Sequence, residues 1–161
     1  MLNSNAPCFS LPAHDGTMFN LLDHLPLVLY FYPRDNTPGC SQEAQDFAAA
    51  YPQFRALGWQ VVGISRDSVK SHQNFARKFN LPFPLLADVE EHVCQAYGVM
   101  VDKILYGKSV RGIERSTFVI DARGIVRASW HKVKVAHHVT TVLAQLATLT
   151  HLENSHGHAA T

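Results

Sequence analysis

The chain has 161 residues, of which 47% are hydrophobic, and its formal net charge is +1. This size and composition fit one globular domain, long enough for a sheet with helices on both faces. A charge so close to neutrality gives no reason to expect a nucleic acid or a membrane surface as a partner, and no apolar run reaches the length of a membrane span. Residues 1–6 contain neither a basic region nor an apolar segment, so we expect no signal peptide.

The three cysteines, Cys8, Cys40 and Cys94, are odd in number and lack the spacing of a disulfide framework. A reducing compartment is the simplest location for such a chain, and we therefore expect the protein in the cytoplasm. No residue near Cys8 in the sequence would activate a thiol, so we assign no redox role to this cysteine.

Secondary-structure patterns begin with a hairpin, because residues 6–12 and 18–21 are extended segments on either side of an Asp15-Gly16 turn. Beyond it, apolar runs alternate with helical patterns. We predict extended segments or strands at 27–31, 59–65, 82–88, 114–121 and 125–130, and helices at 41–57, 69–79, 90–97 and 136–149.

Several residues mark the ends of these elements. Pro52 lies inside the first helical pattern and is expected to kink this helix or to end its first half near Tyr51. Ser68 is expected to cap the next helix. Residues 99–112 show no clean periodicity and are interpreted as a long loop that could contain some strand. Residues 151–161 are polar and are expected to form a flexible tail.

The order of elements is a β-hairpin, a βαβαβα unit, a second β-hairpin and a closing helix. Alternating strands and helices favour a parallel core, and the terminal strands add antiparallel neighbours. We therefore predict an α/β fold with a central mixed sheet flanked by helices. A single domain is expected over residues 1–161, with its core at about residues 4–150.

Cys40 occupies a specific position, because it follows the buried strand 27–31 and begins the helix 41–57. A helix start offers free backbone N–H groups and the positive end of the helix dipole, and both favour a thiolate. Such a position can lower a cysteine pKa to roughly 3.5–7.5. Since free cysteines are commonly buried and inert, a structural thiol is the alternative interpretation.

The residues before Cys40 decide between these interpretations. Pro33, Thr37 and Cys40 form the pattern P-x-x-x-T-x-x-C, and residues 31–44 read Phe-Tyr-Pro-Arg-Asp-Asn-Thr-Pro-Gly-Cys-Ser-Gln-Glu-Ala. This segment resembles the active-site signature of the peroxiredoxins, the AhpC/TSA-like thiol peroxidases, and in particular the Q-type or bacterioferritin comigratory subfamily. The resemblance extends over about residues 6–149. It implies a thioredoxin fold with an N-terminal β-hairpin extension.

The resemblance also implies a set of catalytic residues. Cys40 would attack the peroxide, the hydroxyl group of Thr37 would bond the sulfur or the substrate, and Pro33 would shield the site from water. Arg115 matches the family's distant arginine, although an exposed arginine at a strand end would also fit. Glu43 matches an acidic position that orients this arginine in relatives, and a residue that merely complements the helix dipole fits equally well.

The chemistry explains these residue types. A thiol reduces a peroxide by displacement at oxygen, which requires a thiolate, in-line positioning and donors aimed at the developing charge. Arginine remains charged and offers several donors in a fixed fork. The resemblance implies hydrogen peroxide and organic hydroperoxides as substrates and no cofactor or metal.

Recycling of the oxidised cysteine is where the sequence departs from its relatives. Many Q-type proteins carry a resolving cysteine five residues after the first, where this chain has Gln45, and others carry it in the region of residues 74–77, which contains no cysteine. Either Cys94 resolves Cys40 from an unusual place, or it is a core residue and an external thiol acts on Cys40. Thioredoxin, glutaredoxin or a small thiol would then be the reductant, and the protein would be a monomer or a weak homodimer.

Two other classes of function were compared with this one. A thioredoxin-type disulfide oxidoreductase would need C-x-x-C, but Thr37 lies three residues before Cys40. A redox-sensing or chaperone-like module could use the same fold and cysteine, and slow turnover with every reductant would identify it. His156 and His158 could bind a metal weakly, although a solvated tail explains them as well because no cysteine or carboxylate cluster completes a site.

Overall fold

A five-stranded mixed sheet forms the centre of the protein. The computed structural model describes the backbone of residues 1–159 and the side chains of residues 1–151. The strand order in the sheet is β5-β4-β3-β8-β9, with β3 parallel to β4 and antiparallel to β8. The strands are β3 (Leu27–Phe31), β4 (Gln60–Ser65), β5 (Leu85–Ala87), β8 (Ser116–Ile120) and β9 (Val126–Trp130). This arrangement confirms the predicted mixed sheet.

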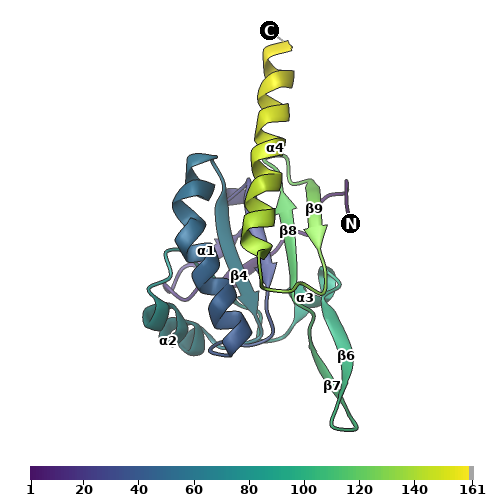
Figure 1. The fold of residues 1–161 in the computed structure, drawn as a ribbon. Coiled ribbons are helices and arrows are strands. Elements are labelled where there is room, and N and C mark those ends of the chain that lie inside the picture. Colours follow the sequence, from purple (N-terminus) through teal and green to yellow (C-terminus); the bar gives the residue numbers. More distant parts are fainter. Residues whose placement is uncertain (160–161) are drawn as a thin grey trace.

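Helices cover both faces of this sheet (Figure 1). They are α1 (Pro38–Ala56), α2 (Val69–Phe79), α3 (His92–Ala96) and α4 (His138–Ala159), with a short 3-10 helix at Leu21–Asp23. Successive strand residues point to opposite faces, so Tyr30 of β3 joins a core cluster with α1, α2 and α4, whereas its neighbour Phe31 joins a second cluster with α3 and the N-terminal segment. The sheet therefore separates two apolar cores.

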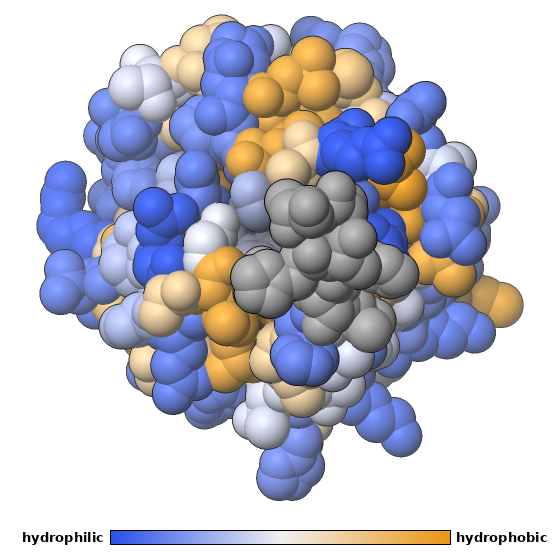
Figure 2. All heavy atoms as spheres, turned by 90° about the horizontal axis from the view of Figure 1, so that it is seen from above, coloured by the Kyte–Doolittle hydropathy of each residue, from blue (hydrophilic) through white to orange (hydrophobic). Residues whose placement is uncertain are grey.

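The N-terminal hairpin is confirmed, with β1 (Ser10–Pro12) antiparallel to β2 (Met18–Asn20). Its turn is held by Asp15, whose carboxylate accepts hydrogen bonds from the Thr17 backbone N–H at 3.0 Å and from the Thr17 hydroxyl at 2.6 Å. None of the described helices has the length and apolar character needed to cross a membrane. The end of the molecule around α4 bears mainly hydrophilic residues with apolar patches between them (Figure 2).

The prediction of a loop at residues 99–112 is wrong. This segment forms a hairpin, which we call the arm, of β6 (Met100–Leu105) and β7 (Lys108–Ile113). Tyr106 and Gly107 both have positive φ, 53° and 78°, as a two-residue hairpin turn requires. Most residues on both faces of the arm are exposed. Without a buried face, apolar and polar residues do not alternate along the strands, and the strand pattern is lost.

Pro52 does not end the first helix near Tyr51, because α1 continues to Ala56. The missing N–H of a proline removes one intrahelical hydrogen bond. Phe47 and Phe54 lie on either side of this position and are fully buried, so tertiary packing holds the helix together. Packing of an apolar face contributes more to helix stability than propensity does.

Other helix ends differ less from their predictions. Ser68 caps α2 as expected, since its hydroxyl accepts the backbone N–H of Ser71 at 3.1 Å. The closing helix α4 ends at Ala159 rather than at Leu149. Residues 151–159, for which a tail was expected, continue this helix. Residues 160 and 161 lie outside the described residues, and the flexibility of the tail stays a prediction. The side chains of His156 and His158, for which weak metal binding was considered, lie outside the described residues.

Candidate active site

Cys40 lies in the first turn of α1, directly beyond the carboxyl end of β3. Pro38 is the first residue of α1, where a missing N–H has no consequence because this group would have no partner inside the helix. Thr37 precedes it in an extended conformation. Cys40 is only 2% exposed. It belongs to the first turn of the helix, whose backbone N–H groups have no partners inside the helix and which carries the positive end of the dipole. The strand-turn-helix position predicted for this cysteine is confirmed.

Arg115 reaches this sulfur from the position directly before β8. Ser116, the first residue of β8, pairs with Phe31 at the end of β3, so the chain just before β8 runs beside the loop that carries Cys40. The Nη2 atom of Arg115 donates to the sulfur of Cys40 at 3.4 Å, and its Nη1 atom donates to Oε1 of Glu43 at 2.7 Å. One guanidinium group therefore bridges the thiol and a carboxyl group.

Glu43 is fully buried one helical turn after Cys40. Burial raises the pKa of its carboxyl group to about 7, even though the charge and hydrogen bond of Arg115 act in the opposite direction. For Arg115, burial lowers the pKa, but its contacts with Glu43 and Cys40 raise it overall. The effect of burial outweighs that of the ion pair for Glu43, whose carboxyl group is wholly enclosed. For Arg115, whose side chain is 15% exposed, the contacts with Glu43 and Cys40 outweigh burial. The second oxygen, Oε2, has no hydrogen-bond partner among the described residues.

Gly39 makes room for this bridge. A Cβ atom built on Gly39 would lie 3.2 Å from Nη2 of Arg115, a separation that would force the guanidinium group to shift. This close approach was not anticipated from the sequence, because Arg115 is 76 positions away from Gly39 in the sequence.

Thr37 and Pro33 line the same loop and are both half-buried. The hydroxyl group of Thr37 donates to the carbonyl oxygen of Arg34 at 3.0 Å. This bond uses the only proton of the hydroxyl, so Thr37 can still accept a hydrogen bond from a substrate. No direct bond joins Thr37 to the sulfur within the described part of the chain.

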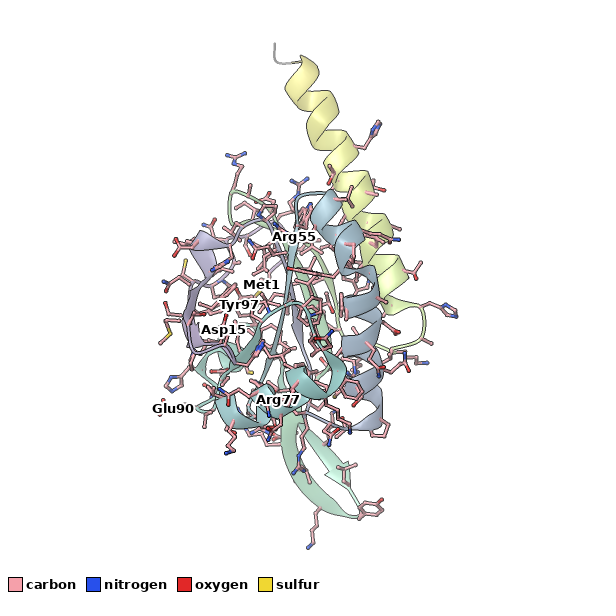
Figure 3. The ribbon with its side chains drawn as sticks, turned by 90° about the vertical axis from the view of Figure 1, so that its left-hand side faces the viewer. Met1, Asp15, Arg55, Arg77, Glu90 and Tyr97 are labelled. Carbon is pink, nitrogen blue, oxygen red and sulfur yellow. The ribbon has the colours of Figure 1, made fainter. Side chains whose placement is uncertain are left out.

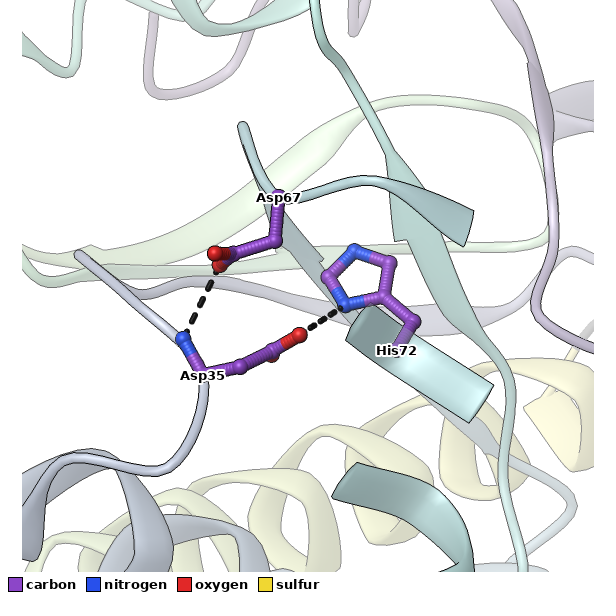
Figure 4. A group of neighbouring side chains, drawn as sticks. All are labelled: Asp35, Asp67 and His72. Atoms are coloured by element: carbon purple, nitrogen blue, oxygen red, sulfur yellow. Dashed lines mark hydrogen bonds and ion pairs between the residues drawn. The ribbon is translucent and has the colours of Figure 1, made fainter. Parts of the chain in front are cut away.

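Asp35 anchors the loop to α2, a contact that the sequence interpretation missed (Figure 4). Its carboxylate accepts hydrogen bonds from the Tyr32 hydroxyl at 2.6 Å, the Ser71 hydroxyl at 2.8 Å and Nδ1 of His72 at 2.7 Å. The backbone N–H of Asp35 donates to Asp67 at 2.9 Å. These bonds fix the backbone five residues before Cys40.

His72 is completely buried. Its Nε2 atom lies 2.9 Å from the carbonyl oxygen of Leu86, and because a carbonyl can only accept, Nε2 carries a proton. On the other side of the ring, Nδ1 faces the carboxylate of Asp35 at 2.7 Å. Asp35, Asp67 and His72 also offer possible metal ligand atoms within 4.8 Å of one another. Since hydrogen bonds already occupy the facing atoms, we interpret the group as a loop anchor.

The other cysteines lie away from Cys40. Cys94 is fully buried in α3 and belongs to the core cluster on the opposite face of the sheet. Burial, together with Asp88, raises the pKa of its thiol well above the usual range. Cys8 is exposed, and its neighbour Phe9 packs against that same opposite cluster.

Comparison with known proteins gives a consistent picture. Residues 2–129 match the model of the AhpC/TSA family. A putative peroxiredoxin bcp of Coxiella burnetii is 50% identical over 147 residues, which cover 90% of this chain and 97% of that protein. Peroxiredoxin Bcp of Bacillus subtilis is 42% identical, with 90% and 94% covered.

Solved structures are similar as well. One is the bacterioferritin comigratory protein of Xanthomonas campestris, described in connection with its alkyl peroxide reduction activity, at 46% identity and a TM-score of 0.84, with 88% of this chain and 92% of that chain covered. Another is a mutant of PrxQ from Xylella fastidiosa, at 38% identity and a TM-score of 0.85, with 92% and 98% covered.

Proposed function

The chain belongs to the AhpC/TSA family and is a peroxiredoxin, a thiol peroxidase that acts on peroxides, and on this premise we propose that Cys40 is the residue that attacks the substrate. The observation that supports this assignment best is the bridge formed by Arg115 between the sulfur of Cys40 and the carboxyl group of Glu43. The guanidinium group places a positive charge 3.4 Å from the sulfur atom that would attack the substrate.

In the proposed reaction, the thiolate sulfur of Cys40 attacks one oxygen of the O–O bond. The S–O bond forms as the O–O bond breaks, and the second oxygen leaves with the bonding electron pair and takes up a proton to become water or an alcohol. The sulfur becomes a sulfenic acid. Arg115 donates hydrogen bonds toward the charge that develops on the oxygens, and the backbone N–H groups at the start of α1 add to this stabilisation.

The remaining loop residues have supporting roles in this proposal. Thr37 accepts a hydrogen bond from the protonated oxygen of the peroxide, since its own proton is used in the loop. Pro33 limits the access of water to the sulfenic acid. Glu43 orients Arg115, and its burial fixes the guanidinium group in one position relative to the sulfur.

We propose a one-cysteine cycle, in which an external thiol recycles Cys40. The location of Cys94 and Cys8 on the other side of the sheet supports this cycle, because a disulfide needs Cα atoms within about 7 Å. A thiol of the reductant would attack the sulfenic sulfur and release water, giving a mixed disulfide. A second thiol would then release Cys40 and leave the reductant oxidised. Thioredoxin, glutaredoxin or a small thiol could serve as this reductant.

The cellular setting is also part of the proposal. All three cysteines are free thiols, which supports a reducing compartment such as the cytoplasm. We further propose that residues 1–161 form one domain that acts as a monomer or as a weak homodimer, since Cys40 and Arg115 come from the same chain.

Two cysteine variants test the assignment. Cys40→Ser is expected to abolish peroxide consumption, whereas Cys8→Ser is expected to leave it unchanged. After one equivalent of peroxide, the intact mass of the wild-type protein is expected to rise by one oxygen atom rather than to fall by two hydrogens. Full activity in Cys40→Ser would overturn the assignment, and a dominant Cys40–Cys94 disulfide in a non-reducing peptide map would overturn the one-cysteine cycle.

A further inference from the structure

The arm, residues 100–113, concentrates exposed apolar side chains. Among the described residues, nine large apolar side chains are exposed, and four of these belong to the arm. They are Ile104, Leu105, Tyr106 and Val110, and Tyr106 at the turn is completely exposed. In two views at right angles, the arm extends away from the packed body of the protein (Figures 1 and 3). Clustered apolar side chains on a projecting element are typical of an interaction site.

The arm is fixed at its base. Glu91, at the start of α3, accepts hydrogen bonds from Nε of Arg111 at 2.8 Å and from Nη1 of Arg66 at 3.1 Å. Arg66 also donates to the carbonyl oxygen of Arg111 at 3.2 Å. Hydrogen bonds from Arg111 and Gln95 lower the pKa of Glu91 to about 2, so its carboxylate stays ionised at neutral pH. The position of the arm is therefore set before any partner arrives.

The base of the arm lies next to the active site. β7 ends at Ile113, two residues before Arg115, whose guanidinium group contacts the sulfur of Cys40. The arm and the first turn of α1 lie at the same end of the molecule (Figure 1). Six residues of strand span roughly 20 Å, so a protein that contacts the tip of the arm can also cover the entrance to Cys40. A small thiol cannot make both contacts.

One face of the arm combines apolar and cationic residues. The register pairs Lys103 with Val110 and Leu105 with Lys108, and because side chains alternate along a strand, these residues share one face. This composition fits a partner surface that is apolar and carries acidic groups.

We propose that the arm is the docking surface for the protein that reduces oxidised Cys40, a thiol protein with an apolar and acidic surface around its attacking cysteine. This inference rests on the proposed one-cysteine cycle, which requires a thiol from outside the chain to act at this end of the sheet. The tip of the arm is the largest concentration of exposed apolar side chains in the described part of the chain, and the base of the arm adjoins the loop that the partner's thiol must reach.

The test compares a protein reductant with a small one. The arm variant is Leu105→Thr together with Tyr106→Asn, because threonine favours strands and asparagine tolerates the positive φ of the turn. A second variant, Lys103→Glu, reverses one charge. The matched control is Leu22→Ser, which changes a side chain that is 65% exposed but lies outside the arm. Turnover is measured with thioredoxin, its reductase and NADPH, and separately with dithiothreitol.

Both arm variants are expected to raise the KM for thioredoxin at least tenfold, while the rate with dithiothreitol and the rate constant for peroxide stay within twofold of wild type. The control is expected to match wild type in every measurement. An unchanged KM for thioredoxin would overturn the proposal, as would an equal loss with both reductants. Loss of self-association without a change in KM would instead assign the arm to a contact between two copies of this chain. A wild-type protein whose Cys40 does not react with peroxide would refute the proposed function rather than the docking surface.

Discussion

Replacing Glu43 with glutamine is expected to change how the stability of the protein depends on pH. The carboxyl group of Glu43 is fully buried against Arg115, and burial raises its pKa from 4.5 to about 7. Between these two values, the folded protein holds a proton that the unfolded chain releases. The stabilising contribution of Glu43 is therefore fully present below pH 4.5 and is lost as the pH rises through 7.

The size of this effect follows from the shift. A change of one pKa unit corresponds to about 1.4 kcal/mol, so a rise from 4.5 to about 7 amounts to about 3 kcal/mol. Glutamine keeps the shape of the side chain and an oxygen that can accept from Arg115, but it does not titrate. The free energy of unfolding of wild type, relative to that of Glu43→Gln, is therefore expected to fall by about 3 kcal/mol from pH 4.5 to above pH 7.

Urea unfolding of both proteins at pH 5, 6, 7 and 8 measures this difference, and the contributions of groups common to both proteins cancel. Glu90→Gln makes the same chemical change at a side chain that is 81% exposed and serves as the control for the substitution itself. A difference between wild type and Glu43→Gln that is constant over this pH range, or that increases with pH, would refute the reasoning.

Two further predictions concern the groups around Cys40. Arg115→Ala removes the donor 3.4 Å from the sulfur and is expected to lower the rate constant for peroxide more than tenfold, the effect of losing at least about 1.4 kcal/mol of transition-state stabilisation; a stopped-flow rate equal to wild type would contradict this. Asp35→Asn replaces a carboxylate that accepts hydrogen bonds from two hydroxyl groups and an imidazole ring. The new amide NH2 group is a donor and would face these donors. The substitution is expected to destabilise the protein by about 2 kcal/mol and to slow the peroxide reaction at least fivefold. Asp121→Asn, which disturbs a buried carboxylate bonded to backbone N–H groups and Arg127, is the control and is expected to reduce stability without slowing the reaction.

Local patterns predicted much of the fold correctly. The strand before Cys40 is buried on both faces and leaves a continuous apolar run. Ser68 acts on a residue only three positions away, and the helices leave apolar residues at helical spacing. The arm has no buried face, so its strands left no such pattern. α1 continues through Pro52 because the helix packs against the rest of the core. The tendency of proline to break helices is a local property and takes no account of this packing, so it predicted the wrong helix end.

The active site was predicted to a similar extent. Cys40 and its motif could be found because Pro33, Thr37 and Cys40 lie within one short segment of the sequence. Arg115 could be added only through the resemblance to a family. The contact between Asp35 and His72 joins residues 37 positions apart. One signal for it was present, because His72 lies three residues before Phe75 on the apolar side of its helix, where a polar side chain needs a buried partner. Its partner could not be identified without the structure.

The separation of the cysteines by the sheet has a consequence for the enzyme under changing conditions. If no thiol of the same chain can trap the oxidised sulfur, the lifetime of the sulfenic acid is set by the concentration of the reductant alone. Each oxidised molecule then divides between two competing fates, reduction and a second reaction with peroxide that gives the irreversible sulfinic acid. The fraction of molecules that remain active after each cycle would depend on the ratio of reductant supply to peroxide supply. The amount of active enzyme would therefore fall when peroxide production exceeds the regeneration of thiols.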